Sequence, residues 1–166
     1  IATFAGLSKV WLGPGLRLGW CILSGPDAAT APLAAAMGQL ARARLCASHP
    51  VQCAVPAALE GPQDHIREVQ HKLRRRRDIT VEQLARIPGF SLVPPRGAFY
   101  AFPRVEFPIS DIDLVRGLIE HTGVVLVHGT GFGQKQGTKH VRIVFLPQEP
   151  LLVEAYEKIR DYCRTL

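Results

Sequence analysis

The chain carries an amine, Lys9, and a guanidinium, Arg17, on either side of a loop that contains two glycines and a proline. Gly13 and Gly15 let the loop backbone come close to a ligand, and Pro14 fixes the turn between them. An amine on a short tether and a cation on the loop could both reach one small anionic ligand. The alternative is a strand, a turn and a strand with two solvated basic residues, because short glycine-containing motifs match by chance.

A third basic residue, Arg142, falls in residues 139–146, which alternate in the manner of a strand. Val141, Ile143 and Phe145 would face one side, and Arg142 would face the other. An unpaired cation among apolar neighbours is costly, so something anionic should meet this guanidinium. Two partners are open: an Asp or Glu of the same chain, or a ligand carboxylate held by two parallel hydrogen bonds.

Residues 6–20, GLSKVWLGPGLRLGW, resemble the cofactor-lysine segment of the class I/II aminotransferases, which are pyridoxal-phosphate enzymes of fold type I. The resemblance implies that Lys9 carries pyridoxal 5'-phosphate as a Schiff base and that Arg17 clamps the cofactor phosphate. Ser8 supplies a hydroxyl beside Lys9 and joins them as a cofactor-binding residue. One position departs from the pattern: Gly6 stands where many members have a hydroxyl or amide side chain.

Three later segments extend the resemblance. Residues 140–145, HVRIVF, resemble the strand whose arginine binds the substrate α-carboxylate, so the resemblance gives that role to Arg142. Residues 94–103, PPRGAFYAFP, resemble a small-domain strand that lies beside the substrate. Residues 128–133, HGTGFG, resemble a loop over the active-site entrance, with His128 where proline is usual.

The periodicity of apolar residues predicts an alternation of strands and helices. Twenty-five residues of helix from 63 to 87 would span nearly 40 Å at ~1.5 Å per residue, long enough to bridge two domains. Residues 18–23 carry no charge and would form a buried strand. The apolar stripe of the C-terminal helix would be Leu152, Tyr156, Ile159, Cys163 and Leu166, and that of the helix at 111–121 would be Ile112, Val115, Leu118 and Ile119. The expected strands are 18–23, 90–93, 98–102, 124–127 and 139–146, and the expected helices are 28–47, 51–60, 63–87, 111–121 and 149–166.

The resemblance implies an α/β fold with a division inside the long helix. Residues 1–75 would hold the end of the large cofactor-binding domain and the start of the interdomain helix. Residues 76–166 would form the small C-terminal α+β domain. Members of the family are more than twice as long as these 166 residues, and their cofactor lysine lies past the middle. The sequence is therefore expected to be a C-terminal portion that is inactive alone.

Composition excludes some other classes of protein. No apolar run approaches the ~20 residues of a membrane helix, so no membrane partner is expected. The four cysteines have no metal-ligand spacing, so no metal site is expected, and scattered free cysteines favour a cytoplasmic location. The net charge of +6 and the basic run 74–77 suggest a DNA-binding helix-turn-helix. Two adjacent prolines at 94–95 stand where its recognition helix should follow, so no nucleic-acid partner is expected.

The expected function is transfer of an amino group between an α-amino acid and a 2-oxo acid through the Lys9 Schiff base, in amino-acid metabolism. The complete enzyme is expected to be a homodimer, as the resemblance implies. A related lyase or decarboxylase, and an inactive small-domain fragment, are the alternatives. The sequence does not identify the amino donor, because an arginine at position 142 would serve any α-amino acid.

Overall fold

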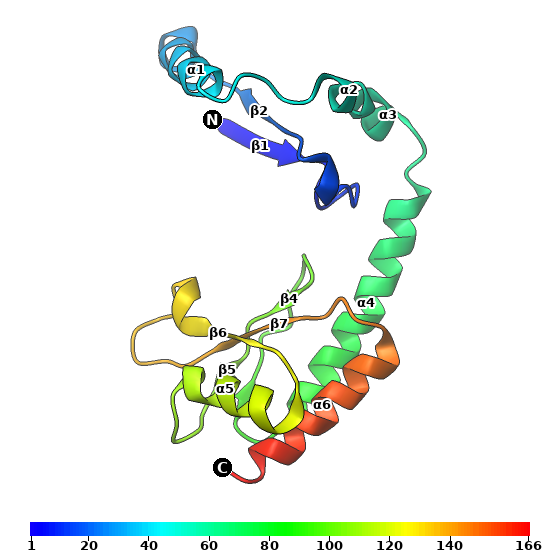
Figure 1. The fold of residues 1–166 in the computed structure, drawn as a ribbon, viewed down its shortest axis with the longest axis vertical. Helices are drawn as coiled ribbons and strands as arrows, with labels where there is room; N and C mark the ends of the chain where they lie inside the picture. Colours follow the sequence, from blue (N-terminus) through cyan, green and yellow to red (C-terminus); the bar gives the residue numbers. More distant parts are fainter. The chain divides into compact units, whose positions relative to one another are not determined.

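The computed structural model describes residues 1–166, and the chain divides into two compact units. The N-terminal unit comprises Ile1–Glu68 and the C-terminal unit comprises Val69–Leu166. Figure 1 shows the elements of each unit with their labels. Helices and strands are present in both, as an α/β fold requires. None of the helices is both long enough and apolar enough to cross a membrane.

The N-terminal unit is built on one antiparallel strand pair. Strand β1 (Ala2–Gly6) pairs with β2 (Gly19–Leu23), and a short 3-10 helix, η1 (Pro14–Leu16), lies in the connection. The two backbones come close at Gly6, where a Cβ atom would lie 2.9 Å from the carbonyl oxygen of Leu18. The predicted strand at 18–23 is confirmed, but its expected burial is wrong, since Ile22 is 54% exposed.

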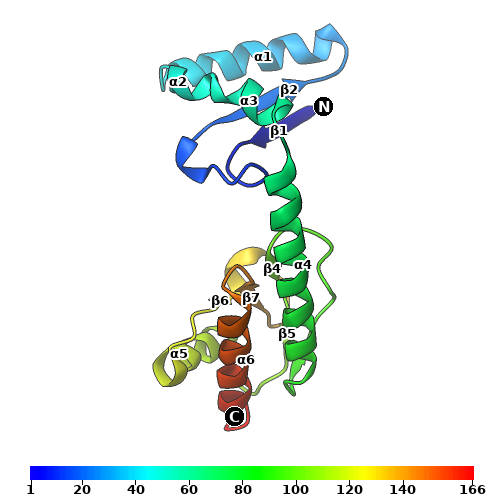
Figure 2. The same cartoon turned by 90° about the vertical axis from the view of Figure 1, so that its right-hand side faces the viewer.

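Three helices follow the strand pair: α1 (Asp27–Arg42), α2 (His49–Gln52) and α3 (Ala54–Glu60). Figure 2 shows them on one side of β1 and β2. None of the three contains a buried residue. Helix α1 ends five residues before the predicted end at 47, and the single helix predicted at 51–60 is two short helices. Only Leu7 and Leu18 of this unit are buried, so the unit has almost no core of its own.

Helix α4 (Asp64–Ala85) begins in the N-terminal unit and continues into the C-terminal unit. The prediction of a long helix at 63–87 is confirmed to within two residues at each end. The chain leaves the helix through Pro88 and Gly89. Gly89 has a φ of +83°, and a Cβ atom there would lie 2.8 Å from the ring of Phe107. The sharp turn therefore depends on glycine.

The C-terminal unit contains two small antiparallel sheets. Strand β3 (Phe90–Ser91) pairs with β5 (Arg104–Val105). Strands β4 (Tyr100–Ala101), β7 (Val141–Val144) and β6 (Val127–His128) form the other sheet in the order β4-β7-β6. The strands predicted at 90–93, 98–102 and 139–146 exist but are shorter than predicted. The strand predicted at 124–127 is mostly wrong, because β6 overlaps it only at Val127. Because strands of two to four residues need partners to persist, pairing and not local pattern sets their ends.

Helices α5 (Asp111–Thr122) and α6 (Glu149–Cys163) complete this unit, and Figures 1 and 2 both show α6 beside α4. The predicted stripe of α6 is confirmed at Leu152, Tyr156, Ile159 and Cys163, whereas Leu166 is 40% exposed.

The predicted stripe of α5 is half wrong. Ile112 and Ile119 are 41% and 43% exposed, while Leu114 is buried in their place. The unit has one continuous core, whose members are Leu84, Ile87, Ala101, Val105, Leu114, Val115, Leu118, Leu126, Val141, Ile143, Phe145, Leu152, Tyr156, Ile159 and Cys163.

Candidate active site

The loop that carries Lys9 is anchored at one buried residue, Leu7. The Leu7 amide donates to the carbonyl of Leu18 at 3.1 Å, and the Leu7 carbonyl accepts from the Gly13 amide at 2.9 Å. The side chain of Leu7 is 1% exposed. Lys9 itself lies on the exposed turn between these anchors, and Ser8 beside it is half-buried. These two backbone hydrogen bonds hold the ends of the turn that carries Lys9.

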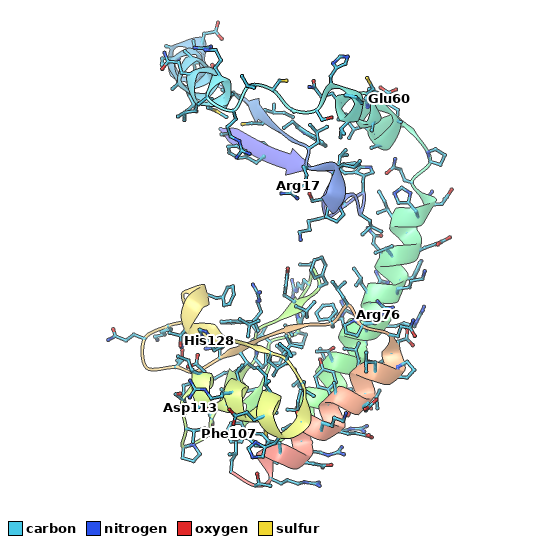
Figure 3. All side chains as sticks on the ribbon, in the orientation of Figure 1. Arg17, Glu60, Arg76, Phe107, Asp113 and His128 are labelled. Carbon is cyan, nitrogen blue, oxygen red and sulfur yellow. The ribbon has the colours of Figure 1, made fainter.

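Arg17 stands at the end of η1 in a strained conformation, and Figure 3 labels it there. Its backbone is left-handed, with φ 53° and ψ 36°. This conformation costs a residue with a Cβ atom about 1–2 kcal/mol relative to the right-handed one. The guanidinium Nη1 donates to the Pro14 carbonyl at 2.9 Å, and the rest of the side chain is exposed. Backbone strain at an exposed arginine is typical of a functional position.

The residues of this loop suit a phosphate-bearing cofactor. A guanidinium is a fork of donors for a phosphate, and a primary amine can link to an aldehyde. A Cβ atom at Gly13 would lie 2.8 Å from Leu16 Cδ1, the end of an exposed side chain that would have to move aside. A Cβ atom at Gly15 would meet nothing within 4 Å, which leaves the loop surface beside Pro14 open.

Arg142 lies in the middle strand of the sheet in the C-terminal unit. Its neighbours Val141, Ile143 and Phe145 are 0%, 3% and 1% exposed, so the predicted alternation of β7 is confirmed. Arg142 is half-buried, and its Nε is buried without a hydrogen-bond partner. No Asp or Glu forms an ion pair with it. Of the two partners that the sequence left open, the acid of the same chain is absent.

Two aromatic rings flank the Arg142 guanidinium. Its Cζ lies 3.9 Å from the ring centroid of Phe132 and 5.1 Å from that of Tyr100. Tyr100 reaches it from β4, which pairs with β7, and Phe132 reaches it from the 3-10 helix η2 (Gly129–Phe132). Ring faces attract a guanidinium and limit its rotation without using its N–H donors. The donors therefore stay available for a planar anion.

A cluster that sequence reasoning missed lies at the start of α5. Asp111 is 5% exposed and accepts hydrogen bonds from the amide and hydroxyl of Thr130 and from the side chain of Gln134. Burial opposes its ionisation. Hydrogen bonds from Thr130 and the nearby His128 ring nevertheless hold the pKa of the Asp111 carboxyl below its ordinary value of 3.8. The residue reads in the sequence as an ordinary acidic start of a helix, so nothing local marks it.

His128, which the sequence singled out, lies in β6 opposite Val141, and Figure 3 labels it. Its ring is half-buried, and Nδ1 is buried without a hydrogen-bond partner. A cavity of about 600 Å³ lies elsewhere in this unit, between residues 122–127, β7 and α6. Its lining is mainly apolar; the charged side chains are Arg142 and the exposed pair Glu154–Lys158.

Lys9, Ser8 and Arg17 belong to the N-terminal unit, and Arg142 belongs to the C-terminal unit.

The sequence matches several curated proteins over almost its full length. It is 37% identical over 166 residues to the alanine aminotransferase of Mycobacterium tuberculosis, and the alignment covers 96% of this chain and 38% of that protein. It is 38% identical over 167 residues to the glutamate-pyruvate aminotransferase AlaA of Haemophilus influenzae, covering 96% of this chain and 41% of that protein. The chain thus spans about two-fifths of the length of these relatives.

Solved structures agree with the sequence matches. The alanine aminotransferase of Pyrococcus furiosus superposes with a TM-score of 0.93 at 38% identity, over 99% of this chain and 42% of that one. An aminotransferase of Escherichia coli superposes with a TM-score of 0.91 at 35% identity, over 98% and 42%. The profile of the family "Aminotransferase class I and II" matches residues 1–159. The chain therefore belongs to the class I and II aminotransferases, whose members are pyridoxal-phosphate-dependent enzymes.

Proposed function

We propose that this chain is the C-terminal part of an aminotransferase that moves an amino group between an α-amino acid and a 2-oxo acid. The observation that carries the proposal is the half-buried Arg142, which has two ring faces against it and no acid partner. A planar cation with its donors available is suited to a carboxylate, which both substrates share. Family membership supports the same reaction.

The N-terminal unit supplies the groups for the cofactor. Arg17 would hold the phosphate, with the Ser8 hydroxyl beside it, and Lys9 would link to the cofactor through Nζ as the Schiff-base lysine. When bound, pyridoxal phosphate supplies an electron sink for the electrons left at the substrate Cα. Once released from the cofactor, the Lys9 amine would remove the proton from that Cα.

Arg142 would hold the carboxylate of the substrate in a fixed plane. Two N–H groups donating to two oxygens define a plane, and the rings of Tyr100 and Phe132 hold the guanidinium in it. Orientation of this kind lowers the barrier without taking part in bond making.

The proposal extends to domains and substrates. Residues 1–75 would be the end of the large domain with the start of the interdomain helix, and residues 76–166 would be the small domain. The relatives named alanine and glutamate-pyruvate aminotransferase make alanine and pyruvate the first substrates to test. The complete enzyme would be a homodimer, and the present 166 residues would not turn over alone.

Reductive trapping tests the cofactor loop. The chain is mixed with pyridoxal phosphate, reduced with borohydride and digested, and the labelled lysine is located by mass. We expect label at Lys9 that is lost in Arg17→Ala and kept in Arg44→Ala, an exposed arginine of the same unit. Equal label on Lys72, Lys135 and Lys158 would contradict the assignment, and so would an equal loss in the control.

Titration with pyruvate tests the carboxylate site. Followed by NMR, pyruvate should shift the Nε–Hε signal of Arg142 in the wild-type chain. Arg142→Lys should weaken binding about tenfold or more, since an ammonium cannot donate from a fork or stack between rings. Arg104→Lys is the matched control on a neighbouring strand, and equal weakening by both variants would argue against a site at Arg142.

A further inference from the structure

The buried carboxylate of Asp111 forms no ion pair, although the His128 and His140 rings interact with it electrostatically. It is 5% exposed, and it accepts four hydrogen bonds from Thr130 and Gln134. The amide and hydroxyl of Thr130 lie 2.7–2.9 Å from its oxygens. A buried anion is costly unless its hydrogen bonds are good, so these contacts hold the turn strongly. Apart from the backbone of Asp111 itself, the donors to this carboxylate, Thr130 and Gln134, come from the segment that follows β6, whose turn is seen in gold in Figure 1.

The same turn is held at its base by the neighbouring strand. The Gly129 amide donates to the His140 carbonyl at 2.8 Å. A Cβ atom at Gly129 would lie 2.7 Å from both the Cβ and the carbonyl oxygen of His140, so the turn packs directly on the chain that leads into β7. Two attachments, Asp111 and His140, therefore fix both ends of Gly129–Thr130.

Phe132 lies two residues beyond Thr130, at the end of η2, and has little else to hold it. Its ring is 45% exposed and is absent from the core of the unit. Its one ring contact is with the Arg142 guanidinium, at 3.9 Å. The position of the ring therefore follows from the backbone of the turn, and the turn depends on Asp111.

We infer that Asp111 is a positioning residue for Arg142, because it fixes the turn that places Phe132 over the guanidinium. The inference rests on the proposed function, in which Arg142 holds the substrate carboxylate. Without the Asp111–Thr130 bonds the ring leaves the guanidinium, which can then rotate about its side-chain bonds. A guanidinium that rotates freely presents its N–H donors in the plane of the carboxylate less often, so it binds the carboxylate more weakly.

The test reads the Nε–Hε signal of Arg142 by NMR in the full chain. A ring face at 3.9 Å shifts this proton upfield, and the Phe132→Leu variant defines its position without the ring. We expect Asp111→Ala and Thr130→Val to move the signal toward the Phe132→Leu position. We also expect both variants to weaken pyruvate binding about fivefold, which is the change in affinity expected when about one hydrogen bond is lost.

Asp113→Asn is the matched control. Asp113 is an exposed carboxylate in the same first turn of α5, where it bonds Ser110 and pairs with Arg116. This variant should leave the Arg142 signal and pyruvate binding unchanged, which separates positioning from a general effect on the helix. If Asp111→Ala does not fold, Thr130→Val provides the test of the inference. Thr130 is exposed, and this substitution removes only its hydroxyl donor.

An Arg142 signal that keeps its wild-type position in a folded Asp111→Ala or Thr130→Val chain would overturn the inference. Failure of the proposed function gives a different result. In that case pyruvate does not shift the Arg142 signal in the wild-type chain, while the comparison among variants without ligand still decides the role of Asp111.

Discussion

The Arg142 side chain is half-buried, yet it keeps N–H donors available for a ligand. Its Nε is buried without an acceptor, which would be costly for an isolated cation. The faces of Phe132 and Tyr100 offset part of that cost, because a guanidinium is weakly hydrated and stacks on rings. The stacking uses the faces of the group and leaves its edge for a ligand.

Arg17 differs from Arg142 because its side chain is exposed and its backbone has a strained, left-handed conformation. Arg17→Gly should leave the N-terminal unit as stable as before, or more stable by up to about 1 kcal/mol, because glycine adopts φ 53° without the Cβ penalty. The same variant should lose the label at Lys9. Urea unfolding followed by tryptophan fluorescence measures the stability, since Trp11 and Trp20 are both in this unit. A clear loss of stability would show that the arginine is there for structure.

His140 should make the C-terminal unit less stable in mild acid. Burial and the nearby Arg104 hold the pKa of His140 below its ordinary value of 6.5, against the opposing effect of Asp111. The folded unit therefore binds fewer protons than the unfolded chain below about pH 6.5, and its stability falls as the pH drops from 7.5 to 5.5. Amide hydrogen exchange of the core at the two pH values measures this change.

The His140→Phe variant is the control for that pH dependence. The imidazole stacks on Phe102 with centroids 4.8 Å apart and the rings 5° from parallel, and phenylalanine can keep this stack. The fall in stability between pH 7.5 and 5.5 should become smaller in the variant. An unchanged fall would assign it to other groups.

At the scale of elements, one buried hydrogen-bond chain ties α6 to α4. The Tyr156 hydroxyl donates to Thr80 Oγ1 at 2.9 Å, and the Thr80 hydroxyl donates to the Arg76 carbonyl at 2.8 Å. Burial raises the pKa of Tyr156 to about 12, although the bond to Thr80 lowers it, so the hydroxyl remains a donor at neutral pH. Arg76 also donates to the Leu146 carbonyl just after β7, so the same helix supports the strand that carries Arg142.

A double-mutant cycle tests this tie. Thr80→Val should destabilise the unit by about 1–3 kcal/mol, because it leaves the Tyr156 hydroxyl buried without an acceptor. Tyr156→Phe should cost about 1 kcal/mol, and the double variant should cost less than the sum. Urea unfolding followed by hydrogen exchange of the α6 amides gives the three values. Strict additivity would mean that the two hydroxyls do not interact.

At the scale of the whole molecule, the two units differ in how much of their apolar surface they bury. The core is drawn entirely from residues 84–163. In the N-terminal unit Phe4, Leu40 and Leu45 are 71%, 75% and 85% exposed. These side chains add little to the folding free energy of the N-terminal unit, because they stay in contact with water.

The units should therefore unfold separately. In a urea series, tryptophan fluorescence, which reports the N-terminal unit, should change at lower urea than the exchange of core amides in the C-terminal unit. The reason is that buried apolar area supplies most of the folding free energy. Coincident transitions would show that the two units are one cooperative structure and that the small N-terminal core is sufficient.

Several patterns that are local in sequence were read correctly, although the apolar stripe of α5 was half wrong. The long helix α4, the buried stripe of α6 and the alternation of β7 follow from periodicities of 3.6 and 2, which each element carries in its own residues. The family could be identified from the motifs at 6–20, 94–103, 128–133 and 140–145, and the profile match over residues 1–159 confirms it. The roles of Lys9, Ser8, Arg17 and Arg142 remain proposals.

Contacts between distant residues were decided by the tertiary structure alone. The ends of the short strands, the exposure of Ile112 and Ile119, and the absence of an acid beside Arg142 all depend on which segments meet. Asp111 lies 19 residues before Thr130 and 31 before Arg142, and no local pattern spans such a distance. By itself the sequence determined the family and the principal helices. Only the fold decided what surrounds each charge, because burial and hydrogen bonding are properties of packed neighbours and not of a residue's own segment.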